Sequence, residues 1–225
     1  MDANSQQLNW HYETLPKETK KALDFLSKQK WLENSNWYLA GGTALSLQCG
    51  NRESYDLDFF TPEKNFDSTI LLKNFIDNKN WITDIASDDT IYGELFGAKV
   101  SFIAYPFFTP KENFALHGII KVVRPIDVAV MKIIAISQRG KKRDFFDLYW
   151  CIKNIAPFKD IILRLKDQYP TVAHDYHHIL KSLVYFNDAE DDVDPTIYFT
   201  VSWPIVKKFF QSEIPKMTKE IMGLM

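Results

Sequence analysis

The residues best suited to chemistry begin with a glycine pair, Gly41 and Gly42, followed at a short distance by two aspartates. An apolar segment at 37–40 precedes the glycines and is typical of a buried strand. Glycine allows the backbone to turn sharply and to approach a bulky anion closely. We therefore expect a strand, a tight turn and a helix that begins near Thr43. The free N–H groups and positive dipole end of such a helix favour phosphate.

The two aspartates, Asp56 and Asp58, lie in a segment at 55–60 where apolar and polar residues alternate as in a strand. Every second side chain of a strand points to the same face, so we expect both carboxylates on one face. Two neighbouring carboxylates repel each other unless a cation lies between them, and Mg²⁺ binds one or two carboxylates together with substrate phosphates. The pattern predicts a site for Mg²⁺ or Mn²⁺. The alternative is a solvated strand end beside a turn.

Two polar residues close to these aspartates offer further contacts to a nucleotide. Arg52 could bind phosphate through two parallel hydrogen bonds, and Ser54 could donate through its hydroxyl group. A capping or surface role fits either side chain equally well.

A second group of charged residues lies downstream, where apolar residues of 126–134 recur at helical spacing. This spacing places Lys132 and Arg139 on the opposite, polar side, and Gly140 is expected to interrupt the helix. In one interpretation the cations neutralise a triphosphate and an aspartate orients them. In the other, the charges form a salt-bridged helical surface. The candidate catalytic residues of this group are Lys132, Arg139, Arg143, Asp144 and Asp147.

Both groups of residues carry a resemblance to a known family. The chain is similar to the AbiEii/AbiGii toxin family of nucleotidyltransferases, in the DNA polymerase beta-type superfamily, through GGTALSLQCGNRESYDLDFF at 41–60 and KIIAISQRGKKRDFFDLYW at 132–150. Two further segments, KVSFIAYPFF and SLVYFNDAEDD, also resemble parts of that family. The resemblance covers most of the chain and favours the catalytic interpretation of the second group.

The resemblance implies a nucleotidyltransferase that needs Mg²⁺ or Mn²⁺ and transfers a nucleotide from an NTP to an RNA or protein acceptor. It also implies a toxin from a bacterial toxin-antitoxin or phage-defence system, with a DNA-binding antitoxin encoded by the neighbouring gene. Two alternatives stay open. One is a catalytically silent nucleotide-binding or interaction module with the same fold, and the other is kinase-like phosphoryl transfer in the same pocket.

The sequence departs from the superfamily pattern at the position of a third carboxylate. This acid is expected on a strand beside the two aspartates, where it would remove the proton of the attacking hydroxyl group. The corresponding strand is predicted at 99–105 and contains no acid, and Ser101 cannot act as a base near neutral pH. Asp84 and Glu94, on adjacent predicted strands, are the candidates to replace it.

Composition limits the class of protein. In 225 residues, 46% are hydrophobic and 15% aromatic, which excludes disorder as the main state. A formal charge of -2 argues against a chain-wide nucleic-acid footprint. Two cysteines cannot form a disulfide framework, and neither a secretory signal nor a run of ~20 apolar residues is visible. We therefore expect a cytoplasmic protein without a membrane partner.

These observations predict an α+β fold, with a small mixed β-sheet, flanking helices and a helical C-terminal portion. We expect strands at 81–85, at 90–105 with a break at Gly97, and at 118–123, and a helix from Pro125 to Ser137. A nucleotidyltransferase-like domain would span 1–125 and a helical domain 126–225, with the active cleft between them. The acidic stretch at 188–194 is predicted to form a solvated loop.

Overall fold

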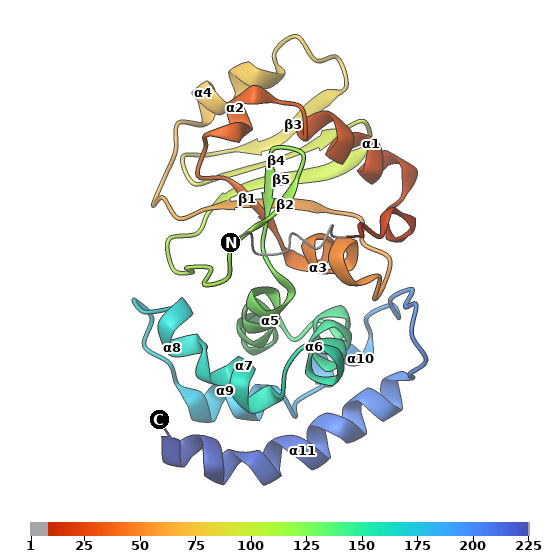
Figure 1. The fold of residues 1–225 in the computed structure, drawn as a ribbon, viewed down its shortest axis with the longest axis vertical. Coiled ribbons are helices and arrows are strands. Elements are labelled where there is room, and N and C mark those ends of the chain that lie inside the picture. Colours follow the sequence, from red (N-terminus) through yellow and green to blue (C-terminus); the bar gives the residue numbers. More distant parts are fainter. Residues whose placement is uncertain (1–8, 225) are drawn as a thin grey trace, which may run out of the picture.

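The computed structural model describes residues 9–224 and confirms the α+β class (Figure 1). Over these residues a seven-stranded mixed sheet has the order β3-β4-β5-β2-β1-β7-β6. Its strands are β1 (Tyr38–Ala40), β2 (Leu57–Thr61), β3 (Trp81–Ala86), β4 (Thr90–Leu95), β5 (Ala98–Ala104), β6 (Ala115–His117) and β7 (Ile120–Val122). β2 is parallel to β5 and β1 is parallel to β7, whereas the other neighbours are antiparallel.

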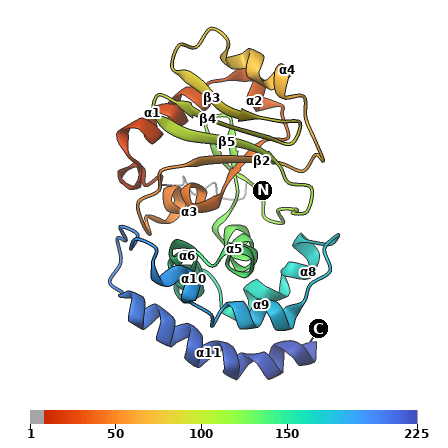
Figure 2. The ribbon, with the colours of Figure 1, turned by 180° about the vertical axis from the view of Figure 1, so that it is seen from behind.

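Helices lie on both sides of the sheet. They are α1 (Lys17–Leu26), α2 (Lys30–Glu33), α3 (Gly41–Cys49), α4 (Ser68–Leu72), α5 (Pro125–Arg139), α6 (Lys142–Asn154), α7 (Phe158–Leu163), α8 (Leu165–Gln168), α9 (Tyr176–Ser182), α10 (Asn187–Glu190) and α11 (Trp203–Leu224). Figures 1 and 2 show α1, α2 and α4 on the side of the sheet away from α5 and α6, with α3 between the sheet and those two helices.

The turn after β1 forms as the glycine pair predicts. β1 is fully buried, and Gly41 begins α3 in the left-handed region with φ +70°. The residue before it, Ala40, has no side chain that could cap the helix, so the first N–H groups of α3 have no side-chain acceptor at this position. β2 ends at Thr61, as expected from Pro62, because proline cannot donate to the sheet.

From Pro125 onwards the named elements of the described chain are helices, and the two that carry the second charged group lie where the sequence predicts them. α5 begins at Pro125 and continues to Arg139, two residues beyond the predicted end, and Gly140 separates it from α6. α5 packs against α3, so the helical portion contacts the glycine turn directly. The division into domains at 1–125 and 126–225 remains a prediction.

The acidic stretch at 188–194 is largely exposed, as its composition predicts, but it is not a loop throughout. Part of it forms α10, and the Asp192 carboxylate accepts a hydrogen bond from the Lys142 backbone N–H at the start of α6, at 2.9 Å. The Lys142 side chain is buried against the same stretch and pairs with Asp194 at 2.9 Å. The stretch therefore binds the positive end of α6, which composition alone could not show.

The chain then returns to the segment after α3. Glu53 donates its N–H to the Thr196 carbonyl at 2.8 Å, and Tyr198 donates to the Asn51 carbonyl at 2.9 Å. An isolated bridge joins Arg52 to Ile197. The segment at 196–198 thus fixes the backbone of residues 51–53 beside α6.

Helices long and apolar enough to cross a membrane are absent from the described part of the chain.

The sheet depends on an aromatic core on the side away from α5. Phe102 on β5 is fully buried and stacks on Phe59 with ring centroids 5.2 Å apart, while Trp31, Trp37 and Phe75 surround it. We expect Phe102→Ala to lower the free energy of unfolding by about 3–5 kcal/mol, because it removes a large buried ring that its neighbours cannot replace. Urea denaturation measures this change.

Ile76→Ala is the matched control, since Ile76 is 76% exposed and its truncation should change the free energy of unfolding by no more than about 0.5 kcal/mol. Equal losses in the two variants would show that Phe102 is not a core residue.

Candidate active site

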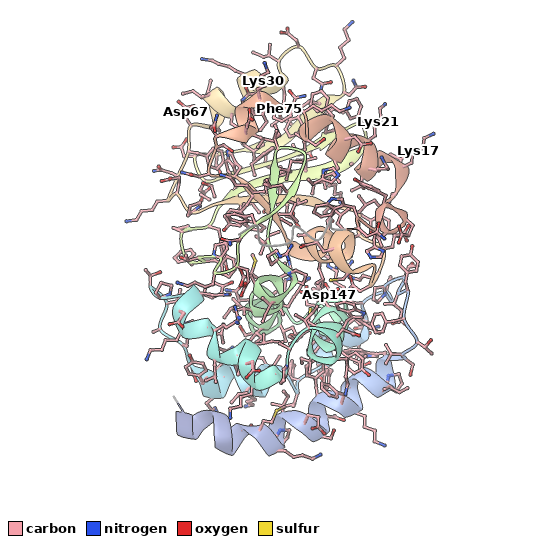
Figure 3. All side chains as sticks on the ribbon, viewed as in Figure 1. Lys17, Lys21, Lys30, Asp67, Phe75 and Asp147 are labelled. Carbon is pink, nitrogen blue, oxygen red and sulfur yellow. The ribbon has the colours of Figure 1, made fainter. Side chains whose placement is uncertain are left out.

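A cavity of about 410 Å³ lies between the sheet and helices α5 and α6. Predicted site residues that line it are Gly41, Gly42, Thr43, Arg52, Ser54, Asp56, Asp58, Lys132, Arg139 and Arg143. Asp144 and Asp147 do not line it, because both are fully buried beneath its wall. Asp147 lies on the side of α6 that faces α3 (Figure 3), and Asp144 contacts Lys132 and Arg139 of α5. One cavity therefore brings together the glycine turn, both acids of the first group and the cations of the second group.

The acids face the glycine turn. Asp58 on β2 lies opposite Ala40 of β1, and Asp56 directly precedes the strand. A Cβ atom at Gly41 would lie 3.2 Å from the Asp58 Oδ2 atom, so the turn approaches this carboxylate closely. With its positive φ, Gly41 suits the position in both conformation and size.

Ser101 occupies the place expected for a third carboxylate. β5 runs parallel to β2 with Ser101 in register with Asp58, and the Ser101 hydroxyl donates to Asp58 Oδ1 at 2.7 Å. The suggested replacements are wrong. Asp84 is exposed at an irregularity of the edge strand β3, Glu94 lies opposite Lys99, and neither lines the cavity.

The two acids form an electrostatically strained pair. Burial raises the pKa of Asp58; the hydrogen bond from Ser101 opposes that rise, and the Asp56 carboxylate adds to it. The nearest cation of Asp56 is Arg143, with Nη1 at 3.7 Å from Oδ2. A cation bound between the carboxylates would relieve this repulsion.

The donor set suits a hard divalent cation. No cluster of three or more His, Cys, Asp or Glu side chains in the described residues is placed to hold a metal ion. Two carboxylates would therefore have to be completed by phosphate or water oxygens, which is the mode of binding that Mg²⁺ commonly adopts.

Hydroxyl groups connect the turn to the acidic strand. Thr43 lies in the first turn of α3; its hydroxyl donates to the Asp56 carbonyl and shares a hydrogen bond of 2.9 Å with the Ser54 hydroxyl. These bonds fix the approach to β2, so Thr43 and Ser54 hold the geometry of the loop as well as lining the cavity.

Beneath the cavity, α5 and α6 share a buried ion cluster. The Lys132 Nζ atom lies 2.7 Å from Asp144 Oδ1 and 2.6 Å from Asp147 Oδ2, and both aspartates are fully buried. The Arg139 Nε atom, on a half-exposed side chain, donates to Asp144 Oδ2 at 3.0 Å. A salt-bridged helical surface, the second sequence interpretation, is therefore wrong for these aspartates.

Arg52 completes the cluster from the segment after α3. Its Nε atom lies 2.8 Å from Asp147 Oδ1 and its Nη2 atom 2.9 Å from Asp147 Oδ2, and Asn51 also donates to Asp147 at 2.9 Å. A Cβ atom at Gly42 would lie 2.2 Å from Arg52 Nη2. Because Gly42 has no side chain, the Arg52 guanidinium group can pack directly against the turn.

The cations of the cluster keep the aspartates charged. Burial alone raises the pKa of both carboxyl groups, but Lys132 with Arg139 outweighs burial at Asp144, and Arg52 with Lys132 outweighs it at Asp147. The pKa of each aspartate therefore lies below its ordinary value.

The cavity also has an apolar end that the sequence interpretation missed. Its residues from α5 are Met131, Ile134, Ala135 and Gln138, and those from elsewhere include Phe60, Ile103, Tyr105 and Tyr169. The four from α5 recur at i, i+3, i+4 and i+7, which is a visible helical stripe. It was hidden because the longer apolar stripe of 126–134, which packs in the core, runs beside it.

The fold is one that known nucleotidyltransferases share. The fold is similar to a Helicobacter pylori protein assigned as a nucleotidyltransferase, with a TM-score of 0.53 at 17% identity over 93% of this chain and 99% of that one. It is also similar to MenT4, a nucleotidyltransferase toxin from Mycobacterium tuberculosis H37Rv, with a TM-score of 0.52 at 17% identity over 92% and 93% of the two chains.

The chain belongs to the AbiEii family of nucleotidyltransferase toxins. The family model described as nucleotidyl transferase AbiEii toxin, type IV TA system, matches residues 24–92 and 99–216. An uncharacterized protein of Aquifex aeolicus (strain VF5) is 37% identical over 187 residues, which cover 80% of this chain and 87% of that protein. These matches confirm the family that the two sequence motifs indicated.

The buried cluster predicts a large loss of stability when one anion is removed. We expect Asp147→Ala to lower the free energy of unfolding by about 3–5 kcal/mol, because Arg52 and Lys132 stay buried without their shared partner. Asp24→Ala, which breaks the exposed pair of Asp24 with Lys20, should cost no more than about 1 kcal/mol. Chemical denaturation at neutral pH compares the two, and similar losses would contradict the role of the cluster.

The same cluster predicts acid sensitivity. A carboxyl group whose pKa is lowered in the folded state contributes its full stability above the unfolded pKa of about 3.9 and loses it as the pH falls towards the folded value. We therefore expect the free energy of unfolding, measured from pH 7 to pH 3, to decrease once the pH drops below about 4 in the native protein. The decrease should be less steep in Asp147→Ala. Parallel curves for the two proteins would oppose this assignment.

Proposed function

We propose that the protein transfers a nucleotide from an NTP to an acceptor hydroxyl group with the help of Mg²⁺ or Mn²⁺. The observation that supports this proposal is the single cavity that joins the start of α3, the carboxylates of Asp56 and Asp58, and the cations of α5 and α6. Each of these three parts matches one need of the reaction: binding of phosphates, binding of metal, and neutralisation of charge.

The triphosphate would lie at the polar end of the cavity. The backbone N–H groups at the glycine turn and the positive end of α3 are suited to bind it. Arg139 and Arg143, each about half exposed, can move towards the phosphates, whereas Lys132 and Arg52 are fixed by the buried aspartates. In this assignment Asp144 and Asp147 position the cations and do not contact the substrate.

Asp56 and Asp58 would hold the metal ion, which would neutralise negative charge on the phosphates and on the departing pyrophosphate. The acceptor oxygen forms a bond to the α-phosphorus atom and its proton passes to water, while the bond from that phosphorus to the bridging oxygen breaks and pyrophosphate leaves. Orientation of the acceptor along this line falls to the cavity residues around Asp58, whose carboxylate is held by the Ser101 hydroxyl.

Membership of a toxin family also suggests what the protein does in the cell. We propose that the protein acts in the bacterial cytoplasm as the toxin of a toxin-antitoxin or phage-defence pair, and that its acceptor is an RNA or a protein. The resemblance also points to a DNA-binding antitoxin encoded by the neighbouring gene.

A second candidate function follows from Ser101. With a hydroxyl group where a base is expected, the site suits a module that binds nucleotides without transferring them. Incubation with radiolabelled NTPs and total cellular RNA or protein separates the two functions. Transfer of label from the α position supports the enzyme, label from the γ position alone indicates a kinase-like reaction, and binding without transfer supports the module.

The metal site predicts the outcome of a binding experiment. We expect the native protein to bind an NTP with Mg²⁺ in isothermal titration calorimetry, and the Asp56→Ala, Asp58→Ala double variant to lose at least about tenfold in affinity, because the metal loses both protein ligands. Asp84→Ala, which removes an exposed acid of the same sheet, should bind as the native protein does. Equal binding by the native and double-variant proteins, or binding by neither, would refute the proposal.

A further inference from the structure

The apolar end of the cavity is built from two facing surfaces of different origin. One is the stripe of α5 that contains Met131, Ile134 and Gln138; the other is the face of the sheet that carries Phe60 and Ile103. On α5 this stripe lies beside the positions of Lys132 and Arg139, so one helix presents cations to one half of the cavity and neutral side chains to the other.

The spacing between the two ends follows from the strands. Phe60 and Ile103 are in register, and they lie two residues beyond Asp58 and Ser101 respectively, on the same face of the sheet. Two residues of a strand span roughly 7 Å. In a nucleotide the ribose separates the α-phosphate from the base by a comparable length, so a phosphate placed over the acids brings the base to the apolar end.

The chemistry of the apolar end suits a flat, uncharged ring. Tyr105 lies half-buried at its edge, and its ring is near Phe60, with centroids 5.6 Å apart. The hydroxyl group of Tyr105 donates to that of Tyr169 at 3.4 Å. An aromatic surface of this kind stabilises a base by stacking, whatever the base.

Gln138 is the polar group available at this end. Its side chain is exposed and lines the cavity, and its amide forms no hydrogen bond with the described residues. An amide carries a donor and an acceptor side by side, and it can pair with two adjacent groups on the edge of a base. This distinguishes Gln138 from its apolar neighbours on the stripe.

We propose that the apolar end is the nucleobase subsite, that Tyr105 packs against the base, and that the Gln138 amide hydrogen-bonds to its edge and determines which NTP is preferred. This inference rests on the proposed function, because it takes the α-phosphate to lie over Asp56 and Asp58. It adds a specificity-determining residue that lies outside the phosphate- and metal-binding groups.

Calorimetric titration of ATP, GTP, CTP and UTP, each with Mg²⁺, tests the role of Gln138. We expect the native protein to prefer one NTP and Gln138→Ala to reduce that preference by about tenfold, because a pair of hydrogen bonds to the base is lost. Gln138→Met, which keeps the length of the side chain without its amide, should give the same loss. Gln211→Ala, an exposed glutamine change on α11, is the matched control and should keep the native preference.

Tyr105 is tested in the same titrations. Tyr105→Leu should lower the affinity for all four NTPs by roughly tenfold without changing their order of affinity, since stacking does not depend on the identity of the base. Tyr105→Phe keeps the ring and should retain the native affinities.

The outcomes separate the inference from the proposed function. Equal affinity of the native protein for all four NTPs, or an unchanged preference in Gln138→Ala and Gln138→Met, would overturn the inference while leaving nucleotide binding in place. Failure of the native protein to bind any of the four would instead overturn the proposed function.

Discussion

The arrangement of the cations depends on the buried ion cluster in which Asp144 and Asp147 of α6 hold Lys132 of α5 and Arg52. Buried ion pairs add little net stability, yet losing one partner is costly, so such a cluster fixes geometry more than it strengthens the fold. It joins three segments far apart in the sequence. Through it, the helical portion is aligned with the glycine turn and with the two acids on β2.

Other parts of the structure serve the same alignment. Gly42 leaves room for the Arg52 guanidinium group, and the return of the chain at 196–198 fixes residues 51–53. The acidic stretch that precedes this return binds the first turn of α6 through Lys142. The C-terminal part of the chain therefore stabilises the site by holding residues 51–53 and the start of α6, although it contributes few of the side chains that line the cavity.

Local patterns in the sequence were sufficient for the parts of the site that depend on neighbouring residues. The strand, glycine turn and helix at 37–49, the alternation that places Asp58 on the cavity side of β2, and the helix break at Gly140 each follow from a few consecutive residues. The absence of an acid on the strand beside Asp58 was also visible, because alternation identified that strand correctly.

The remaining features depend on distant contacts and could not be read locally. Asp144 and Asp147 occupy polar helical positions, yet both are buried, because Lys132 and Arg139 of α5 cover Asp144 and Arg52 with Asn51 covers Asp147. The acidic stretch at 188–194 is charged like a solvated loop, yet it faces the positive end of a helix. Gln138 lies on a stripe that only the opposing sheet face turns into a wall of the cavity.

The central claim is that one metal ion bound by both aspartates holds a triphosphate against the start of α3. Anomalous diffraction from crystals grown with Mn²⁺ and a non-hydrolysable NTP tests this most directly. We predict one Mn²⁺ peak in contact with carboxylate oxygens of both Asp56 and Asp58, with the phosphates at the N–H groups of Gly41 and Gly42. A metal peak elsewhere, or phosphates bound away from this turn, would contradict the account.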